Sequence, residues 1–209
     1  MSAAHDDLVS RWLSQSGKDF INAVLNLNIT PNQYKNACIK FFGAESCQIQ
    51  AETFQGISEF EDLRGMDLAD KDLRNMVFAA ADLSYAKLDG VQLDGASFSC
   101  AKIYASSLQN CVAQSSVDFF QCYAQGSNFQ GVKLHGANFC NADLRYSNFQ
   151  NSTLVNCDFS ASQLQHSSFN GVIMKNCKIG GAHLSLCHQS ENWYVLGEFI
   201  DQDEIIWED

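Results

Sequence analysis

The chain has 209 residues, a formal net charge of −11 and a pI near 4.7, which makes nucleic-acid backbones and anionic membranes poor partners and favours a basic partner surface. Its nine cysteines include no C-x-x-C pair, so neither a zinc ribbon nor a thioredoxin-like site is expected. No apolar stretch reaches the roughly 18 residues of a membrane helix and the first residues lack a signal-peptide pattern, so we expect a cytoplasmic protein.

Residues 1–44 are expected to be helical. The apolar residues within 8–13 and within 20–25 each have the spacing of a single helix face. Ser16 and Asp19 have the spacing of a capping box, with Asp in place of the usual Glu, and this predicts the start of the second helix.

A third helix is predicted between Thr30, which has the position of an N-cap, and Gly43, which follows its end. Two roles are open for this helical segment. It either covers the first coil of the structure that follows or serves as a partner-binding module. Residues 45–60 are interpreted as a transition that can form an imperfect first coil.

Residues 61–187 repeat with a period of five. Every fifth residue from Leu63 is almost always large and apolar, the register slips by one residue at 114–118, and the pattern resumes until Leu184. The residue two places earlier is small or β-branched from Ala81 onwards. The other three positions are mostly polar and are expected to face water, Ser84 among them.

This period fits neither a helix nor a simple strand, but it fits a square coil with one quintet on each side. Successive coils would then pair as parallel strands at a spacing of about 4.8 Å. Residues 20 apart stack on one face, which predicts ladders of stacked phenylalanine rings. The predicted core includes Leu83, Phe98, Phe119, Phe129, Phe139, Phe149, Phe159 and Phe169.

The repeat resembles the pentapeptide repeat proteins. Their pattern A(D/N)Lxx occurs at 81–85, 137–141 and 142–146, and the resemblance covers about residues 61–186. It implies a mainly β protein, a right-handed quadrilateral parallel β-helix, here with a small N-terminal helical segment.

The resemblance implies a non-catalytic scaffold for protein–protein interaction, and the partner's identity is open. An alternative follows from the quinolone-resistance members of the family, which are understood to be acidic, DNA-mimicking dimers that bind DNA gyrase. This chain shares their acidity and repeat, but it adds the helical segment, and its acids form no continuous stripe. A topoisomerase is therefore the second candidate partner.

The segment 188–209 differs in composition from the repeat. Its seven acids are accompanied by aromatic and aliphatic residues and by no Lys or Arg, so it is expected to cap the last coil and can also form a homodimer contact. The candidate partner-binding residues are Asp62, Asp67, Asp72, Asp82, Trp193, Tyr194, Phe199 and Trp207.

Catalysis and metal binding are not expected. His183, Cys187 and His188 lie close together in sequence, but no fourth ligand is evident, so neither a metal nor a cofactor is predicted. Cys157 and Cys177 are 20 residues apart and should stack on adjacent coils, where a disulfide is geometrically conceivable but reduced, buried thiols are favoured. Cys111 and Cys122 are expected to be buried in the same way. No nucleophile elbow, P-loop or dinucleotide motif occurs.

Overall fold

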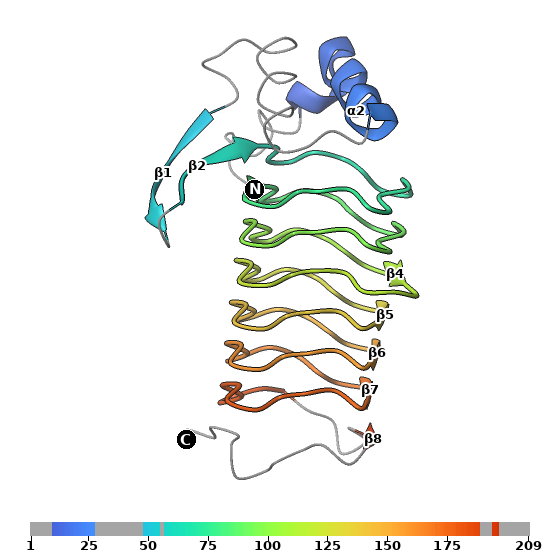
Figure 1. Ribbon diagram of the computed structural model, residues 1–209, viewed down its shortest axis with the longest axis vertical. Coiled ribbons are helices and arrows are strands. Elements are labelled where there is room, and N and C mark those ends of the chain that lie inside the picture. The colour runs from blue at the N-terminus through green and yellow to red at the C-terminus, as the bar shows by residue number, and fades with distance from the viewer. Residues whose placement is uncertain (1–9, 28–47, 55–56, 189–193, 197–209) are drawn as a thin grey trace.

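The computed structural model describes residues 10–27, 48–54, 57–188 and 194–196. They form a straight stack of coils with helix α2 (Gln15–Leu27) lying across the N-terminal end (Figure 1). Among these residues, no helix is long and apolar enough to cross a bilayer.

The coils repeat every 20 residues, as the period predicts. Parallel bridges join Asp118 to Asn138 and Asn138 to Asp158, and the same 20-residue step recurs along the stack. The coils are joined by backbone hydrogen bonds at the inward residues. For example, the Phe119 N–H donates to the carbonyl of Asn138 at 2.8 Å. The predicted fold, a right-handed parallel β-helix with few helices, is confirmed.

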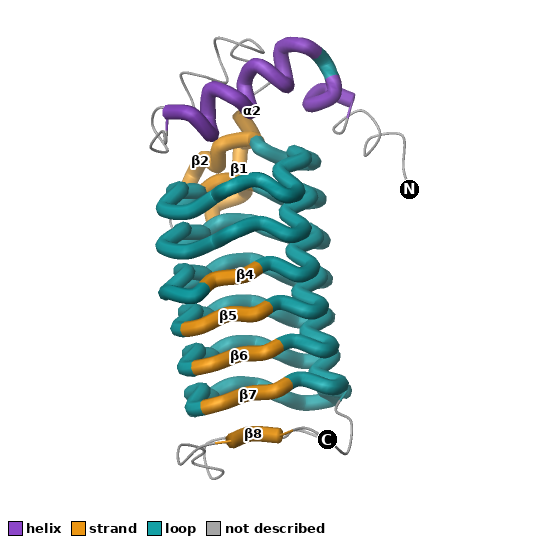
Figure 2. Tube along the Cα trace, turned by 90° about the vertical axis from the view of Figure 1, so that its right-hand side faces the viewer, coloured by secondary structure: helices purple, strands orange, loops and turns teal. Residues whose placement is uncertain are grey.

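Two small sheets lie on opposite sides of this stack. β1 (Gln48–Phe54) pairs antiparallel with β2 (Ile57–Asp62), which runs parallel to β3 (Ala81–Asp82). The second sheet is parallel throughout and stacks in sequence order (Figure 2). It contains β4 (Val112–Ala113), β5 (Lys133–His135), β6 (Thr153–Val155), β7 (Ile173–Lys175) and β8 (Tyr194–Leu196).

Phenylalanine rings fill the centre of the coils in two ladders. Phe119 and Phe139 stack with centroids 4.8 Å apart, and Phe129 and Phe149 with centroids 4.7 Å apart. The two ladders meet edge to face, as between Phe119 and Phe129 at 5.8 Å and 88°. The predicted core residues are all fully buried (Leu83, Phe98, Phe119, Phe129, Phe139, Phe149, Phe159 and Phe169).

The expectation that Ser84 faces water is wrong, because its exposed fraction is 6%. Ser84 and the neighbouring Asp82 lie on the side of the solenoid where β2 pairs with β3. Both views show the β1–β2 hairpin beside the first coils on this side (Figures 1 and 2). The hairpin also shows that residues 48–62 do not form a complete coil, since only the end of β2 takes a coil register.

The predicted register slip is present as one inserted residue. Ser97 pairs with Asp118, 21 residues later, whereas bridges on either side of the insertion span 20. Asp94 holds the insertion, because its Oδ1 accepts hydrogen bonds from the N–H groups of Gln114 at 2.7 Å and Ser115 at 2.9 Å.

Helix α2, which corresponds to the second predicted helix, begins earlier than predicted. Ser14, not Ser16, is its cap, since the Ser14 hydroxyl oxygen accepts from the Gly17 N–H at 3.0 Å. Trp12 is buried as expected, but Leu13 is 63% exposed although the spacing placed it on the same face. The predicted third helix lies outside the described residues.

Candidate protein-binding surfaces

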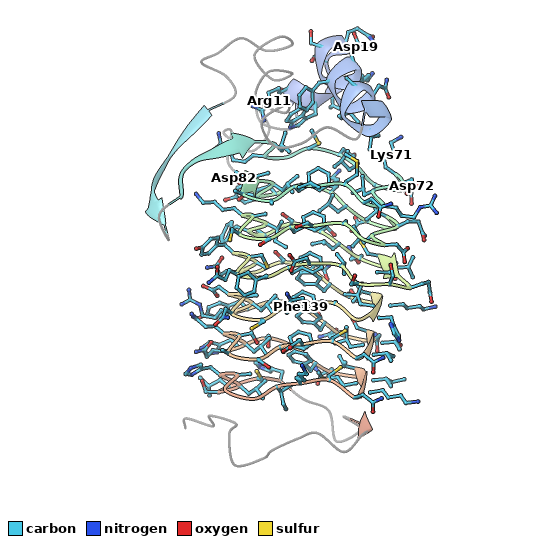
Figure 3. All side chains as sticks on the ribbon, viewed as in Figure 1. Arg11, Asp19, Lys71, Asp72, Asp82 and Phe139 are labelled. Atoms are coloured by element: carbon cyan, nitrogen blue, oxygen red, sulfur yellow. The ribbon has the colours of Figure 1, made fainter. Side chains whose placement is uncertain are left out.

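The acidic residues predicted to bind a partner do not form one surface. Asp82 and Asp72 lie on opposite sides of the solenoid (Figure 3), and Asp67 lies on the side between them in chain order. Asp72 is already paired with Arg74 at 2.5 Å. Asp82 is 4% exposed and is therefore not available to a partner.

Several other predicted binding residues fall outside what the structure describes. Tyr194 belongs to β8 and is in register with Ile173. The side chain of Asp62, and all of Trp193, Phe199 and Trp207, lie outside the described residues. The expected cap and homodimer contact of the C-terminal segment therefore remain predictions, apart from the strand β8 that this segment adds to the sheet.

The acidity of the chain is not a property of the solenoid. Residues 63–188 contain nine Asp or Glu residues and nine Lys or Arg residues, so this part has no formal net charge. The excess lies in residues 1–62, with eight acids against four bases, and in residues 189–209, with seven acids and no base. The regular coils thus present a neutral wall to a partner.

Tyrosine side chains gather on one side of this wall. The four tyrosines between residues 63 and 188 belong to the quintets whose inward residues are Leu83, Ile103, Ala124 and Leu144, and His166 belongs to the next quintet on this side, that of Leu164. We call this surface the tyrosine face, and it comprises Tyr85, Tyr104, Tyr123, Tyr146 and the neighbouring His166.

Backbone hydrogen bonds between coils set the spacing of the tyrosine face. Parallel bridges connect Lys102 to Tyr123 and Tyr123 to Asp143. The Tyr85 N–H donates to the carbonyl of Tyr104 at 2.9 Å, which places these two side chains on adjacent coils. The face is therefore built on the regular ladder and not on a loop.

The aromatic rings of this face form two contacts that remain open to solvent. Tyr85 and Tyr104 meet edge to face at 5.6 Å, and Tyr146 stacks on His166 at 4.7 Å. Tyr146 is 62% exposed and Tyr104 is 46% exposed. Exposed rings that are held by a rigid backbone lose little conformational entropy on binding.

A polar network fills the space between the two ring pairs. Arg145 donates to both carboxylate oxygens of Asp143, at 2.8 and 2.6 Å, and Gln125 donates to the same carboxylate at 2.5 Å. Tyr123 lies beside them, and burial, with the charges of Cys100 and Asp143, raises the pKa of its hydroxyl. Arg145 is thereby fixed in place with its guanidinium partly exposed.

Sequence reasoning did not find this face, although the signal was present. The tyrosines occupy different positions within their quintets, so no single outward column contains them. They come together only when successive coils are aligned, with residues 20 apart placed side by side, or 21 apart across the insertion at 114–118.

The thiols and histidines form no chemical centre among the residues that are described. Cys111, Cys122, Cys157 and Cys177 are buried free thiols, and burial raises the pKa of Cys111 to about 12. The thiols of Cys111, Cys157 and Cys177 each face a backbone carbonyl, as Cys177 faces Leu154 at 3.4 Å. Within the described ranges, no group of three potential ligands is close enough to hold a metal ion.

Comparison with protein families gives one match. The chain matches the family profile of the pentapeptide repeats in 8 copies, at residues 62–91, 77–112, 125–160 and 154–188. No curated protein sequence matches it.

Solved structures with the same fold are distant in sequence. HetL, a pentapeptide repeat protein involved in heterocyst differentiation regulation from the cyanobacterium Nostoc sp. strain PCC 7120, is 18% identical, with a TM-score of 0.25 over 59% of this chain and 76% of that one. QnrB1, a plasmid-mediated fluoroquinolone resistance protein, is 17% identical, with a TM-score of 0.29 over 62% and 78%. A pentapeptide repeat protein from the Arabidopsis thaliana thylakoid lumen is 24% identical, with a TM-score of 0.29 over 58% and 63%.

Proposed function

Because the chain belongs to the pentapeptide repeat family, we propose that it is a non-catalytic scaffold that binds another protein through the tyrosine face. The observation that carries this proposal is the placement of three exposed tyrosines, Tyr85, Tyr104 and Tyr146, on one side of the solenoid, with the buried Tyr123 on the same side.

The interior of the coils supports a binding role over a catalytic one. Two phenylalanine ladders and the small residues beside them occupy the core, and the side chains there are fully buried. Any function of the coils must therefore use the outward side chains. Those of the tyrosine face combine rings, amides and a fixed guanidinium.

Tyrosine and arginine are the residue types that dominate the energetics of protein interfaces. Tyr104 and Tyr146 offer large rings with a polar hydroxyl, and Asp143 holds the guanidinium of Arg145, the residue before Tyr146. Its exposed side chains are spread over successive coils, so it fits a folded partner surface or an extended strand better than a small molecule.

The charge distribution does not favour the topoisomerase alternative. A protein that mimics DNA needs a regular array of negative charge, whereas the coils from 63 to 188 have no formal net charge. The acidic residues of these coils are spread over several faces, and Asp72, Asp143 and Asp158 each lie beside a cation. A supercoiling assay with purified gyrase tests this alternative directly, since inhibition at micromolar protein would support it.

Affinity capture from the native host, followed by mass spectrometry, tests the tyrosine face. The bait pair is the unchanged chain and a variant with Tyr104→Ser and Tyr146→Asn, where Asn suits the positive φ of 61° at position 146. The control variant carries Lys87→Ser and Gln92→Ser, two exposed positions on other faces. We expect partners that the control retains and the tyrosine variant loses, and retention by both variants would refute the proposal.

A further inference from the structure

The sheet formed by β4–β7 presents a second surface, on the side opposite the β1–β2 hairpin (Figure 1). This is also the side opposite the tyrosine face, because β2 pairs with β3 in the quintet of Leu83. We call the outward side chains of β5, β6 and β7 the sheet face. Parallel pairing arranges them as a grid of three rows and two columns. The rows are Lys133 and His135, Thr153 and Val155, and Ile173 and Lys175.

Cations and apolar groups share this grid without any acid. Lys133 and Lys175 are exposed at opposite corners, and neither forms an ion pair with another described residue. Ile173 is 45% exposed, an unusual state for a large aliphatic side chain on a regular sheet. The sheet face thus places Thr153 and Val155, both partly exposed, between two ammonium groups, with the exposed Ile173 at a third corner.

The spacing of the two lysines defines what can bind between them. They are two strands apart, about 9.6 Å at the usual strand spacing, and two residues apart along the strand, about 6.6 Å. The resulting diagonal is about 12 Å. An extended peptide rises about 3.3 Å per residue, so carboxylates four residues apart span about 13 Å and match this diagonal.

The chain contains a segment with this spacing. Glu204 and Glu208 are four residues apart and are separated by Ile205, Ile206 and Trp207. In an extended conformation Glu204, Ile206 and Glu208 share one side, because side chains alternate. This sequence of acid, aliphatic and acid complements the diagonal from Lys133 to Lys175, along which Ile206 would lie over the side chains of Thr153 and Val155.

We propose that the sheet face is a binding site for an acidic and apolar peptide segment, and that residues 204–209 of the same chain are its occupant. These residues lie outside the described part, so the argument rests on their sequence and on the described face. Strand β8 belongs to the same sheet and its Leu196 is in register with Lys175. The seven residues 197–203 can span about 23 Å when extended, which is enough to reach β5 from there.

Attachment to the same chain favours this occupant over an external one. A tethered segment has an effective concentration in the millimolar range, so weak contacts suffice to keep it bound. An external protein that uses this face must then displace the segment. The inference concerns a different surface from the tyrosine face and does not depend on the proposed function.

Competitive lysine acetylation of the intact chain, read by mass spectrometry, tests the proposal. Lys87, an exposed lysine on another face, is the internal reference. We expect Lys133 and Lys175 to react several-fold more slowly than Lys87. With Glu204→Gln and Glu208→Gln, both should react at the reference rate.

The matched control removes the same charge elsewhere. A variant with Glu191→Gln and Glu198→Gln loses two acids of the same segment but not the predicted pair, and it should keep the protection. Equal reactivity of the three lysines in the unchanged chain would overturn the proposal, as would protection that survives the change at 204 and 208. Protection that appears only with a 46 kDa species, twice the 23.2 kDa chain, would assign the occupant to a second copy and refute binding within one chain.

Discussion

The indole Nε1 of Trp12 donates a hydrogen bond of 2.6 Å to the backbone carbonyl of Arg64. Arg64 belongs to the first coil, and among the described residues no backbone N–H of a preceding coil donates to its carbonyl. The indole ring is buried with Phe20, at a centroid distance of 5.5 Å. The side chain of Trp12 thus satisfies a backbone hydrogen-bond acceptor and covers apolar surface at the open end of the solenoid.

Replacing Trp12 by Phe should therefore weaken the cap. The change removes the indole donor to the Arg64 carbonyl, leaves only the longer bond from Arg11 at 3.4 Å, and reduces the buried ring, which together should cost about 1–3 kcal/mol. Urea unfolding followed by circular dichroism measures the loss. Leu13→Ala is the matched control, because this neighbour is 63% exposed and should change stability by less than about 0.5 kcal/mol. Equal effects would show that the described contact does not hold the cap.

The ring ladders make a stronger prediction for the centre of the coils. Phe139 contacts rings on the coils before and after it, at 4.8 Å in each case, and it is fully buried. Phe139→Ala should cost about 3–5 kcal/mol, since the cavity cannot be filled by its neighbours. Gln163→Ala, at an exposed position, should stay within about 0.5 kcal/mol in the same urea titration. A small effect at 139 would contradict the assigned register.

The coil and its core could be read from the sequence because inward positions repeat locally. Leu63 and the residues at five-residue steps after it need no information from distant segments. The burial of Ser84 could not be read in this way, because an outward position in the repeat does not show which segments pack beside the coil. The tyrosine face was missed for a related reason. Tyr85 and Tyr146 meet their neighbours only through the 20-residue stacking, which the period of five does not show.

Two glycines allow the cost of backbone strain to be distinguished from the cost of a side-chain clash. Gly171 and Gly126 have nearly the same positive φ, 70° and 68°, so an added Cβ strains the backbone equally. At Gly171 the Cβ would lie 2.6 Å from Oδ1 of Asn151, whereas at Gly126 it meets no atom within 4 Å. Gly171→Ala should therefore cost about 1 kcal/mol more than Gly126→Ala in thermal unfolding.

A second change identifies the cause of this difference. Asn151 itself has a φ of 58°, so Asn151→Gly removes the blocking side chain without adding strain. In that background the two alanine substitutions should become equally costly. If the difference persists, the contact with Asn151 does not cause it.

The pH dependence of stability should depend on Asp82. Burial raises the pKa of this carboxyl above its ordinary value of 3.8, against the opposing effects of hydrogen bonds from Ser84 and the charges of Lys102 and Arg64. As the pH rises, the Asp82 carboxyl therefore ionises in the unfolded chain before it ionises in the native state. The native state loses stability between pH 3.8 and the raised pKa. The loss is complete once the pH exceeds the raised pKa.

Asp82→Asn should accordingly raise the melting temperature at pH 7. The Asn side-chain oxygen can still accept from the Ser84 N–H, a bond of 2.9 Å in the native chain, while the buried charge is gone. The gain should disappear at pH values well below 3.8, where Asp82 is protonated in both states. Asp72→Asn provides the opposite sign, because the hydrogen bond from Arg74 lowers the pKa of Asp72 to about 2. Its stabilising effect is present above 3.8 and is lost as the pH falls towards 2, so this second variant should melt earlier at pH 7. A lower melting temperature for Asp82→Asn at pH 7 would mean that Lys102 and Arg64 outweigh burial at this site.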